Sequence, residues 1–303
     1  MHVDIDRPTR RKRNDMPGTL PDRCGTYAIG GHEITRLGLG TAQINESGAW
    51  SHPENAAEAA RVLREAVDLG VNLIDVAESS GPFDYEELIA QSLSPYPEDL
   101  LLMIKGGLLR SPQGQWEPLP RPSFLRKQIE TRLWYLKLDR IPLFQLHGFS
   151  PRAPIADQLG LLTDLQREGK IGQIGLAEVT PAELREAGEF ADIATVQAEY
   201  NLVNRAADPL VDYAESANIG FIPWLPLATG ALAGENGPVA EAARWRGVSP
   251  AQIALAWLLN RSPALLPTPG TLSVRHLREN VAAADIRLTA AEVADLDRLV
   301  PRP

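Results

Sequence analysis

Short apolar runs alternate with longer amphipathic segments along most of this chain. The amphipathic segments repeat apolar residues every three or four positions, the period of a helix, and they predict helices near residues 55–69, 85–94, 122–137, 155–168, 181–189, 206–217 and 249–260. The apolar runs predict buried strands near residues 37–40, 72–75, 100–105, 141–147, 172–177, 194–198, 219–223 and 263–267. Each helical segment is long enough to connect two parallel strands, so eight βα units are expected.

Eight such units favour the α/β class and a closed (β/α)8 TIM barrel. An open doubly wound sheet is the main alternative, but its first turn normally reads G-x-G-x-x-G. Here residues 38–43 read GLGTAQ and lack the third glycine. Two short strands around Gly30-Gly31 predict an N-terminal β-hairpin that covers one end of the barrel. Residues 274–284 and 289–300 predict extra C-terminal helices, the second of which opens on a capping box, Thr289 to Glu292.

The first part of the chain differs from the rest. Residues 1–23 are polar, with a basic cluster at 7–13, and we expect a disordered tail because they cannot bury enough apolar surface to fold alone. An anion-binding role for the basic cluster is the less favoured alternative. Residues 24–303 are then expected to form a single barrel domain, a size that one barrel commonly reaches.

Three successive predicted strands end on residues that can carry chemistry. The runs that begin near 72, 100 and 141 stop at Asp75, Lys105 and His147. The C-terminal ends of parallel strands meet at one edge of a barrel, where active sites are built. Asp75 could instead cap the following helix, but three such residues in order favour a site.

Composition excludes several function classes. The formal charge of −9 over 303 residues argues against a nucleic-acid partner, since phosphate binding needs a basic field. Cys24 is the only cysteine, and neither a metal-binding motif nor an apolar run of membrane-spanning length occurs. We therefore expect a cytoplasmic protein that acts on a small molecule, away from membranes and without a metal. The oligomeric state is left open.

From the predicted hairpin to Pro303, the chain resembles the aldo-keto reductase superfamily. The segments that carry the resemblance are LGLGTAQ (37–43), GVNLIDVAESSGP (70–82), MIKGG (103–107), FQLHG (144–148), IGQIGLAEVT (171–180), VQAEYNLVNR (196–205), FIPWLPLATGALAG (221–234) and PTPGTLSVRHLREN (267–280). The resemblance implies carbonyl reduction with NADPH inside a barrel.

The resemblance also implies roles for individual residues. Asp75, Lys105 and His147 match three members of the family's catalytic tetrad. The cofactor-binding positions would be Gly40, Thr41, Asp75, Glu178, Gln197, Trp224, Leu227, Gly270, Thr271, Arg275, Glu279 and Asn280. Trp224 would stack on the nicotinamide and Gln197 would hold its amide. An arginine beside a threonine suits a 2′-phosphate, because guanidinium groups bind phosphate in a fork.

Two positions depart from the family pattern. Ser80 stands where the family has its tyrosine acid, and Ala177 stands where a carboxamide-binding serine is expected. A serine hydroxyl is a far weaker acid than a phenol, so His147 is the best remaining proton donor. A water held by Ser80, a contribution from Tyr85, or an iminium substrate that needs little protonation are the alternatives.

The substrate side is suggested by aromatic residues in the loops that follow the strands. Trp50, Phe83, Trp116 and Phe149 could line a pocket for a sizeable, fairly apolar substrate, or they could anchor the loops by packing. The sequence thus predicts an NADPH-dependent reductase of a carbonyl or imine with an atypical proton donor. A catalytically impaired NADPH-binding regulator or sensor is the alternative.

Overall fold

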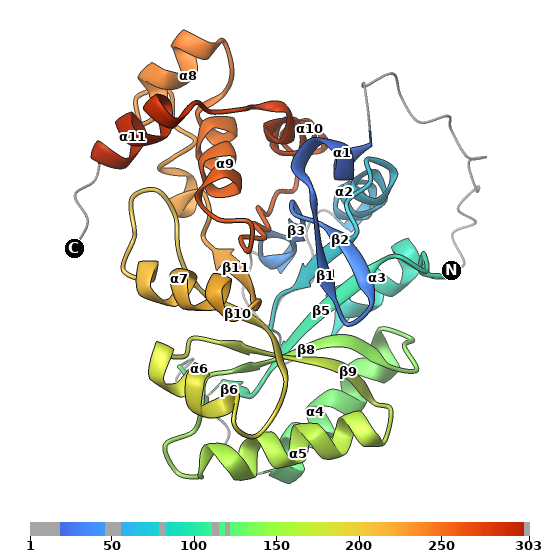
Figure 1. Ribbon diagram of the computed structural model, residues 1–303. Coiled ribbons are helices and arrows are strands. Elements are labelled where there is room, and N and C mark those ends of the chain that lie inside the picture. The colour runs from blue at the N-terminus through green and yellow to red at the C-terminus, as the bar shows by residue number, and fades with distance from the viewer. Residues whose placement is uncertain (1–18, 46–55, 79–82, 111–114, 119–121, 300–303) are drawn as a thin grey trace.

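A parallel sheet that curls into a barrel forms the centre of the molecule (Figure 1). The computed structural model describes residues 19–45, 56–78, 83–110, 115–118 and 122–299. Within these residues seven strands pair in the order β11-β10-β9-β8-β5-β4-β3. Their bounds are β3 Leu39–Gly40, β4 Leu73–Val76, β5 Leu101–Gly106, β8 Ile141–His147, β9 Ile171–Ala177, β10 Ile193–Glu199 and β11 Gly220–Trp224.

An extended segment, residues 264–270, occupies the eighth strand position of the barrel, where the sequence predicted a regular strand near 263–267. On one side it pairs with β11, where Phe221 N donates to Ala264 O at 2.8 Å. On the other side Gly38 N donates to Pro267 O at 2.9 Å. Pro267 and Pro269 have no backbone N–H, so this segment cannot form a continuous ladder. The (β/α)8 barrel is confirmed, and it closes through this irregular segment.

Helices follow the strands as the apolar periodicity predicts. They are α2 Ala56–Asp68, α3 Asp84–Leu93, α4 Pro122–Tyr135, α5 Ile155–Arg167, α6 Pro181–Ala187, α7 Asp208–Ser216 and α9 Pro250–Arg261, and the C-terminal additions are α10 Val274–Ala282 and α11 Ala290–Arg298. The capping box at the start of α11 is present. The short helix α8 Ala240–Arg246 was not predicted, because its seven residues, mostly Ala and Arg, make only about two turns and carry little periodic signal.

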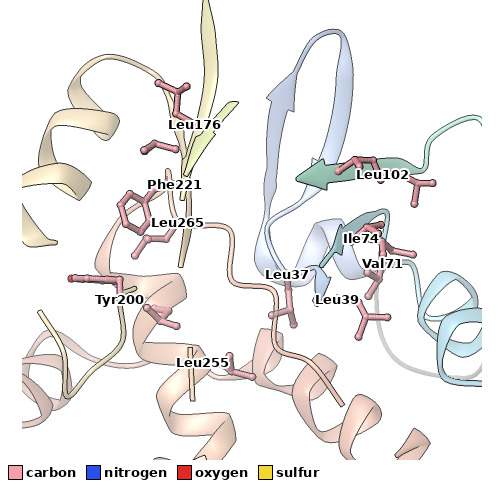
Figure 2. Close-up of a cluster of buried hydrophobic side chains, with 14 of the residues drawn as sticks. Leu37, Leu39, Val71, Ile74, Leu102, Leu176, Tyr200, Phe221, Leu255 and Leu265 are labelled. Atoms are coloured by element: carbon pink, nitrogen blue, oxygen red, sulfur yellow. The ribbon is translucent and has the colours of Figure 1, made fainter. Parts of the chain in front are cut away.

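Two apolar cores lie on opposite faces of the curled sheet. The larger one lies between strands and helices, and Figure 2 shows part of it, with Leu37, Leu39 and Ile74 on one side and Tyr200, Phe221 and Leu265 on the other. The smaller core fills the barrel interior and includes Leu73, Met103 and Leu143.

The predicted N-terminal hairpin supplies part of that interior core. Strands β1 Thr26–Ile29 and β2 His32–Thr35 pair antiparallel, and Ile29 and Ile34 pack among the inward-facing strand residues. Gly30 and Gly31 take positive φ angles of 55° and 86°, which the tight turn requires. The hairpin therefore closes the N-terminal end of the barrel, and the opposite end is left for a site.

The tail boundary predicted at residue 23 is wrong by several residues. Leu20–Cys24 forms a short helix, α1, in which Leu20 and Cys24 are buried. Arg23 pairs with Asp285, with Nε and Oδ1 2.5 Å apart. Leu20 and Cys24 lie four residues apart and are buried on one side of the helix, while the carboxylate that binds Arg23 is far away in the sequence. The polar composition of residues 1–23 does not reveal these contacts. Residues 1–18 lie outside the described residues.

A second hairpin was also missed. Strand β6, Leu108–Arg110, pairs antiparallel with β7, Trp116–Pro118, in the segment after β5 where the sequence predicted a loop around Trp116. Its two strands are three residues long. Such short strands next to glycine and proline give no usable alternation.

Candidate active site

The inward faces of three adjacent strands carry the predicted Asp75, Lys105 and His147. Leu73, Met103 and Leu143 lie in the interior core, and side chains two residues apart on a strand share a face. Asp75 and Lys105 each follow one of these core residues by two positions, and His147 follows Leu143 by four. Because β4, β5 and β8 are neighbours in the sheet, all three side chains reach the open C-terminal end of the barrel.

Asp75 and Lys105 form a buried ion pair between the carboxylate Oδ1 and the ammonium Nζ. Their residues are 7% and 9% exposed. Burying either charge alone would be costly, so each residue depends on the other to lie here. The pair fixes a lysine ammonium at the mouth of the barrel.

The second carboxylate oxygen of Asp75 is also engaged. Gln197 Nε2 donates to Oδ2 at 2.9 Å, and Thr268 Oγ1 donates to the same oxygen at 3.4 Å. Asp75 thereby links β4, β10 and the closing segment. Gln197, predicted as a cofactor contact, is brought to the site and touches Asp75 there.

His147 has a partner that the sequence reasoning missed. Its Nδ1 lies 2.8 Å from Oε2 of Glu78, and Oε1 of Glu78 accepts a hydrogen bond from Leu108 N at 3.0 Å. The Glu78 side chain is 6% exposed and that of His147 is 28% exposed. The sequence did offer one indication of Glu78: it is a carboxylate three residues beyond Asp75, close to Ser80, which stands where the family has its tyrosine.

Tyr85, the weaker candidate for the proton donor, has a structural contact instead. Its hydroxyl donates to the carbonyl oxygen of Ala77, and the residue is buried. Burial, followed by the charge of Glu86, raises the pKa of Tyr85 well above its ordinary value. A phenol in this setting is a poor acid and anchors the turn after β4. Ser80 lies outside the described residues.

Gly40, Thr41 and Gly270, predicted at the cofactor site, lie where the barrel closes. Gly40 pairs with Gly270 in a parallel bridge, so two backbones meet where a side chain would not fit. Thr41 N donates to Asp75 O at 3.0 Å, and Thr41 Oγ1 accepts from Ala77 N at 3.0 Å. Thr41 therefore ties the end of β3 to the end of β4, next to Asp75.

Trp224 and Glu178 form a second cluster at the ends of β11 and β9. The indole Nε1 donates to Oε1 of Glu178, whose backbone takes a positive φ of 56°. This bond holds the indole at the mouth of the barrel. Leu227 follows at the turn after β11 and packs against the outer core.

The remaining cofactor positions gather at the start of α10. Ser273 caps this helix and accepts from His276 N at 3.4 Å, and it also donates its own N–H to Thr271 Oγ1 at 3.0 Å. Arg275 has a side chain that is 76% exposed and lies 3.4 Å from Glu279. Asn280 is buried. An exposed guanidinium beside a helix N-terminus has the donor chemistry for a phosphate group.

The aromatic residues predicted to line a substrate pocket differ in their surroundings. Phe83 stacks on Tyr135 of α4, with ring centroids 4.6 Å apart, and Phe149 packs against the outer core. Both therefore have the packing contacts of loop anchors. Trp116 is 39% exposed on β7. Trp50 lies outside the described residues.

Comparison with known proteins gives a consistent result. The model of the Aldo/keto reductase family matches residues 36–301. An uncharacterized oxidoreductase of Schizosaccharomyces pombe is 38% identical over 275 residues, covering 91% of this chain and 90% of that protein. Pyridoxine 4-dehydrogenase of Escherichia coli is 37% identical over 278 residues, covering 90% of this chain and 97% of that protein.

Solved structures of similar shape agree with these relatives. A glycerol dehydrogenase from Gluconobacter oxydans superposes with a TM-score of 0.83 at 25% identity, covering 92% of this chain and 97% of that one. An aldo/keto reductase from Klebsiella pneumoniae, solved with NADP and acetate, gives a TM-score of 0.78 at 26% identity, covering 92% and 96%.

Neither a membrane-spanning helix nor a metal-binding cluster occurs within the described part of the chain. No helix there is both long and apolar enough to cross a membrane. In the same part of the chain, no three His, Cys, Asp or Glu side chains are grouped in a way that could hold a metal ion.

Proposed function

Because this chain belongs to the aldo/keto reductase family of oxidoreductases, we propose that it is an NADPH-dependent enzyme that reduces a carbonyl or imine group. The substrate we propose is a sizeable, fairly apolar small molecule. The observation that carries the proposal is the meeting of a buried Asp75–Lys105 pair with a carboxylate-bound His147 at the open end of the barrel. Groups this costly to bury are kept where they serve chemistry.

The residues present fit the cofactor. Arg275, Thr271 and the N-terminus of α10 would hold the adenosine phosphate, and Trp224 and Gln197 would hold the nicotinamide end. When bound, the nicotinamide supplies a hydride to the substrate carbon. Support for this cofactor comes from the relatives of similar structure that were crystallised with NADP or NADPH.

The chain's own residues supply the proton. His147, with its Nδ1 side bound to Glu78, would donate from Nε2 to the substrate oxygen as charge develops there. Lys105, held by Asp75, would place a positive charge beside that oxygen. These two effects replace the phenol that is absent at Ser80.

A titration and a kinetic variant test the proposal. We expect NADPH to quench or shift tryptophan fluorescence, and Trp224→Ala to weaken binding. We also expect His147→Ala to lower turnover by roughly 10²-fold or more, the usual contribution of a general acid. Turnover should be measured with a panel of substrates that contains aromatic aldehydes, ketones and cyclic imines. Pyridoxine with NADP⁺ should be added as a test of the oxidative direction, because one relative is a pyridoxine 4-dehydrogenase.

The matched control is His32→Ala. His32 lies on β2, in the hairpin at the closed end of the barrel, so its replacement by alanine should leave turnover unchanged. Wild-type turnover in His147→Ala would show that another group donates the proton.

The alternative function is a cofactor-binding regulator. The replacement of the family tyrosine by Ser80 favours it, since loss of the acid can mean loss of reduction. It predicts NADPH binding without oxidation of the bound cofactor in a single turnover. Stoichiometric oxidation of bound NADPH by any member of the panel would exclude it.

A further inference from the structure

We propose that Glu78 is a positioning residue that fixes the ring orientation of His147 and balances the charge of its protonated form. This inference rests on the proposed function, in which His147 donates a proton. The contact that carries it joins Nδ1 of His147 to Oε2 of Glu78 at 2.8 Å.

A carboxylate can only accept hydrogen bonds, so the nitrogen that faces Glu78 must carry a hydrogen. Nδ1 is therefore the N–H end of the ring in both the neutral and the protonated states. Nε2 is the only ring nitrogen whose proton can change, and it points away from Glu78. The tautomer of His147 is thus set by its neighbour rather than by chance.

Glu78 is itself held in place. Its second oxygen accepts the backbone N–H of Leu108 at 3.0 Å, and its side chain is 6% exposed. Leu108 begins β6, the first strand of the hairpin that follows β5. The carboxylate therefore bridges the loops after β4 and β5 and holds the histidine at the end of β8.

Among the described residues, the charges at this end of the barrel leave Glu78 as the counter-ion of His147. From the neighbouring strands, Asp75 and Lys105 form an ion pair that brings no net charge. Glu178, which follows β9, accepts a hydrogen bond from Trp224. A carboxylate in direct contact with the ring can balance the positive charge of an imidazolium, the form that gives up a proton to the substrate.

The proton balance is complete with these groups. The substrate carbon would gain the hydride that NADPH supplies, which leaves NADP⁺, while the Nε2–H bond breaks and its proton goes to the substrate oxygen. The ring is left neutral with Nδ1–H still bound to Glu78. Because the His147 side chain is 28% exposed, Nε2 can be reprotonated from solvent after product leaves.

Glu78→Gln gives the sharpest test, because it keeps the acceptor for Leu108 N but presents an amide N–H to Nδ1. Side-chain ¹⁵N NMR of the five histidines, with His147 assigned by the signal lost in His147→Ala, reports the tautomer. We expect Nδ1–H in the wild-type protein and Nε2–H in Glu78→Gln. The signals of the other histidines serve as internal controls.

Kinetics supply the second readout. Glu78→Gln should lower kcat by about 10²-fold with little change in KM, the scale of a general-acid effect. Glu78→Asp, which restores a carboxylate, should recover part of the rate.

An unchanged His147 tautomer and a wild-type kcat in Glu78→Gln would overturn the inference. This outcome is separable from failure of the proposed function, which is a failure of the wild-type protein to bind NADPH or to oxidise it. If the wild-type protein is inactive, the tautomer comparison alone decides whether Glu78 positions His147. If it is active, both readouts must change together.

Discussion

At the scale of single residues, Tyr85 separates an anchoring role from a chemical one. Its hydroxyl donates to the Ala77 carbonyl oxygen in a buried setting that raises its pKa well above the ordinary value. We expect Tyr85→Phe to lower the free energy of unfolding by about 1 kcal/mol, because that carbonyl loses its donor. Turnover should stay close to wild type. Urea unfolding and steady-state NADPH oxidation measure the two effects.

Tyr96→Phe is the matched control for this prediction. Its hydroxyl donates to the Leu136 carbonyl oxygen at 2.7 Å, at the end of α4, and burial likewise raises its pKa. The two variants should lose similar stability. A loss of turnover in Tyr85→Phe that Tyr96→Phe does not share would identify Tyr85 as a proton donor.

The same residues show how far the sequence reaches at this scale. Asp75, Lys105 and His147 could be predicted because each ends an apolar run, and strand periodicity then fixes the side on which each lies. Glu78 could not, since it lies in a loop, where no period fixes side-chain direction. Its contact with His147 depends on the path of the chain beyond β4, which only the structure gives.

At the scale of elements, one ion pair joins α8 to α11, which lie side by side in Figure 1. Arg246 donates to both carboxylate oxygens of Glu292 at 2.6 Å each. This bond first, and then the backbone N–H and hydroxyl of Thr289, lower the pKa of Glu292 to about 2. Because the folded pKa is below the unfolded value, the pair stabilises the fold above pH ~4.5, and that stability is lost as the pH falls toward 2.

We therefore expect Glu292→Gln to lower the Tm at neutral pH and to make the Tm less sensitive to acid below pH ~4.5. Thermal unfolding between pH 7 and pH 3.5 measures both effects. The control is Glu183→Gln at the capping box of α6, where no arginine partner occurs within the described part of the chain. Equal acid sensitivity of the wild type and Glu292→Gln would contradict the assignment.

The elements also differ in how well they could be predicted. Helices α6, α9 and α11 are preceded by the N-cap residues Thr180, Ser249 and Thr289, each in a capping box, and the apolar spacing beyond them is regular. Helices α1 and α8 are stabilised by partners far away in the sequence, such as Asp285 for Arg23 and Glu292 for Arg246. Local pattern cannot detect such long-range contacts.

At the scale of the whole molecule, eight βα units predicted a closed barrel, but the means of closure was hidden. The prolines at 267 and 269 prevent a regular eighth strand, so the last contact between the ends of the sheet depends on close backbone approach. Gly40 and Gly270 meet there, next to Thr41 and Asp75. The closure of the fold and the support of the candidate site are therefore the same structural feature.

This coincidence predicts that Gly40→Ala will damage both stability and function. A Cβ at Gly40 would lie 2.5 Å from the Thr268 carbonyl oxygen, which belongs to backbone and cannot move aside cheaply. We expect the free energy of unfolding to fall by about 2–3 kcal/mol, the cost of overpacking a tight site. NADPH binding should weaken as well, because the closing segment carries Gly270 and leads into α10.

Gly160→Ala is the control of opposite sign. Gly160 lies inside α5, and a Cβ there would meet nothing within 4 Å, so alanine should raise the free energy of unfolding by roughly 0.5–1 kcal/mol through its better helix propensity. Urea unfolding of both variants tests the pair, and NADPH titration tests the link to function. If Gly40→Ala unfolds at the wild-type urea midpoint and binds NADPH normally, the barrel tolerates opening at this seam, and Asp75 owes its position to β4, Lys105 and Gln197 rather than to the closing segment.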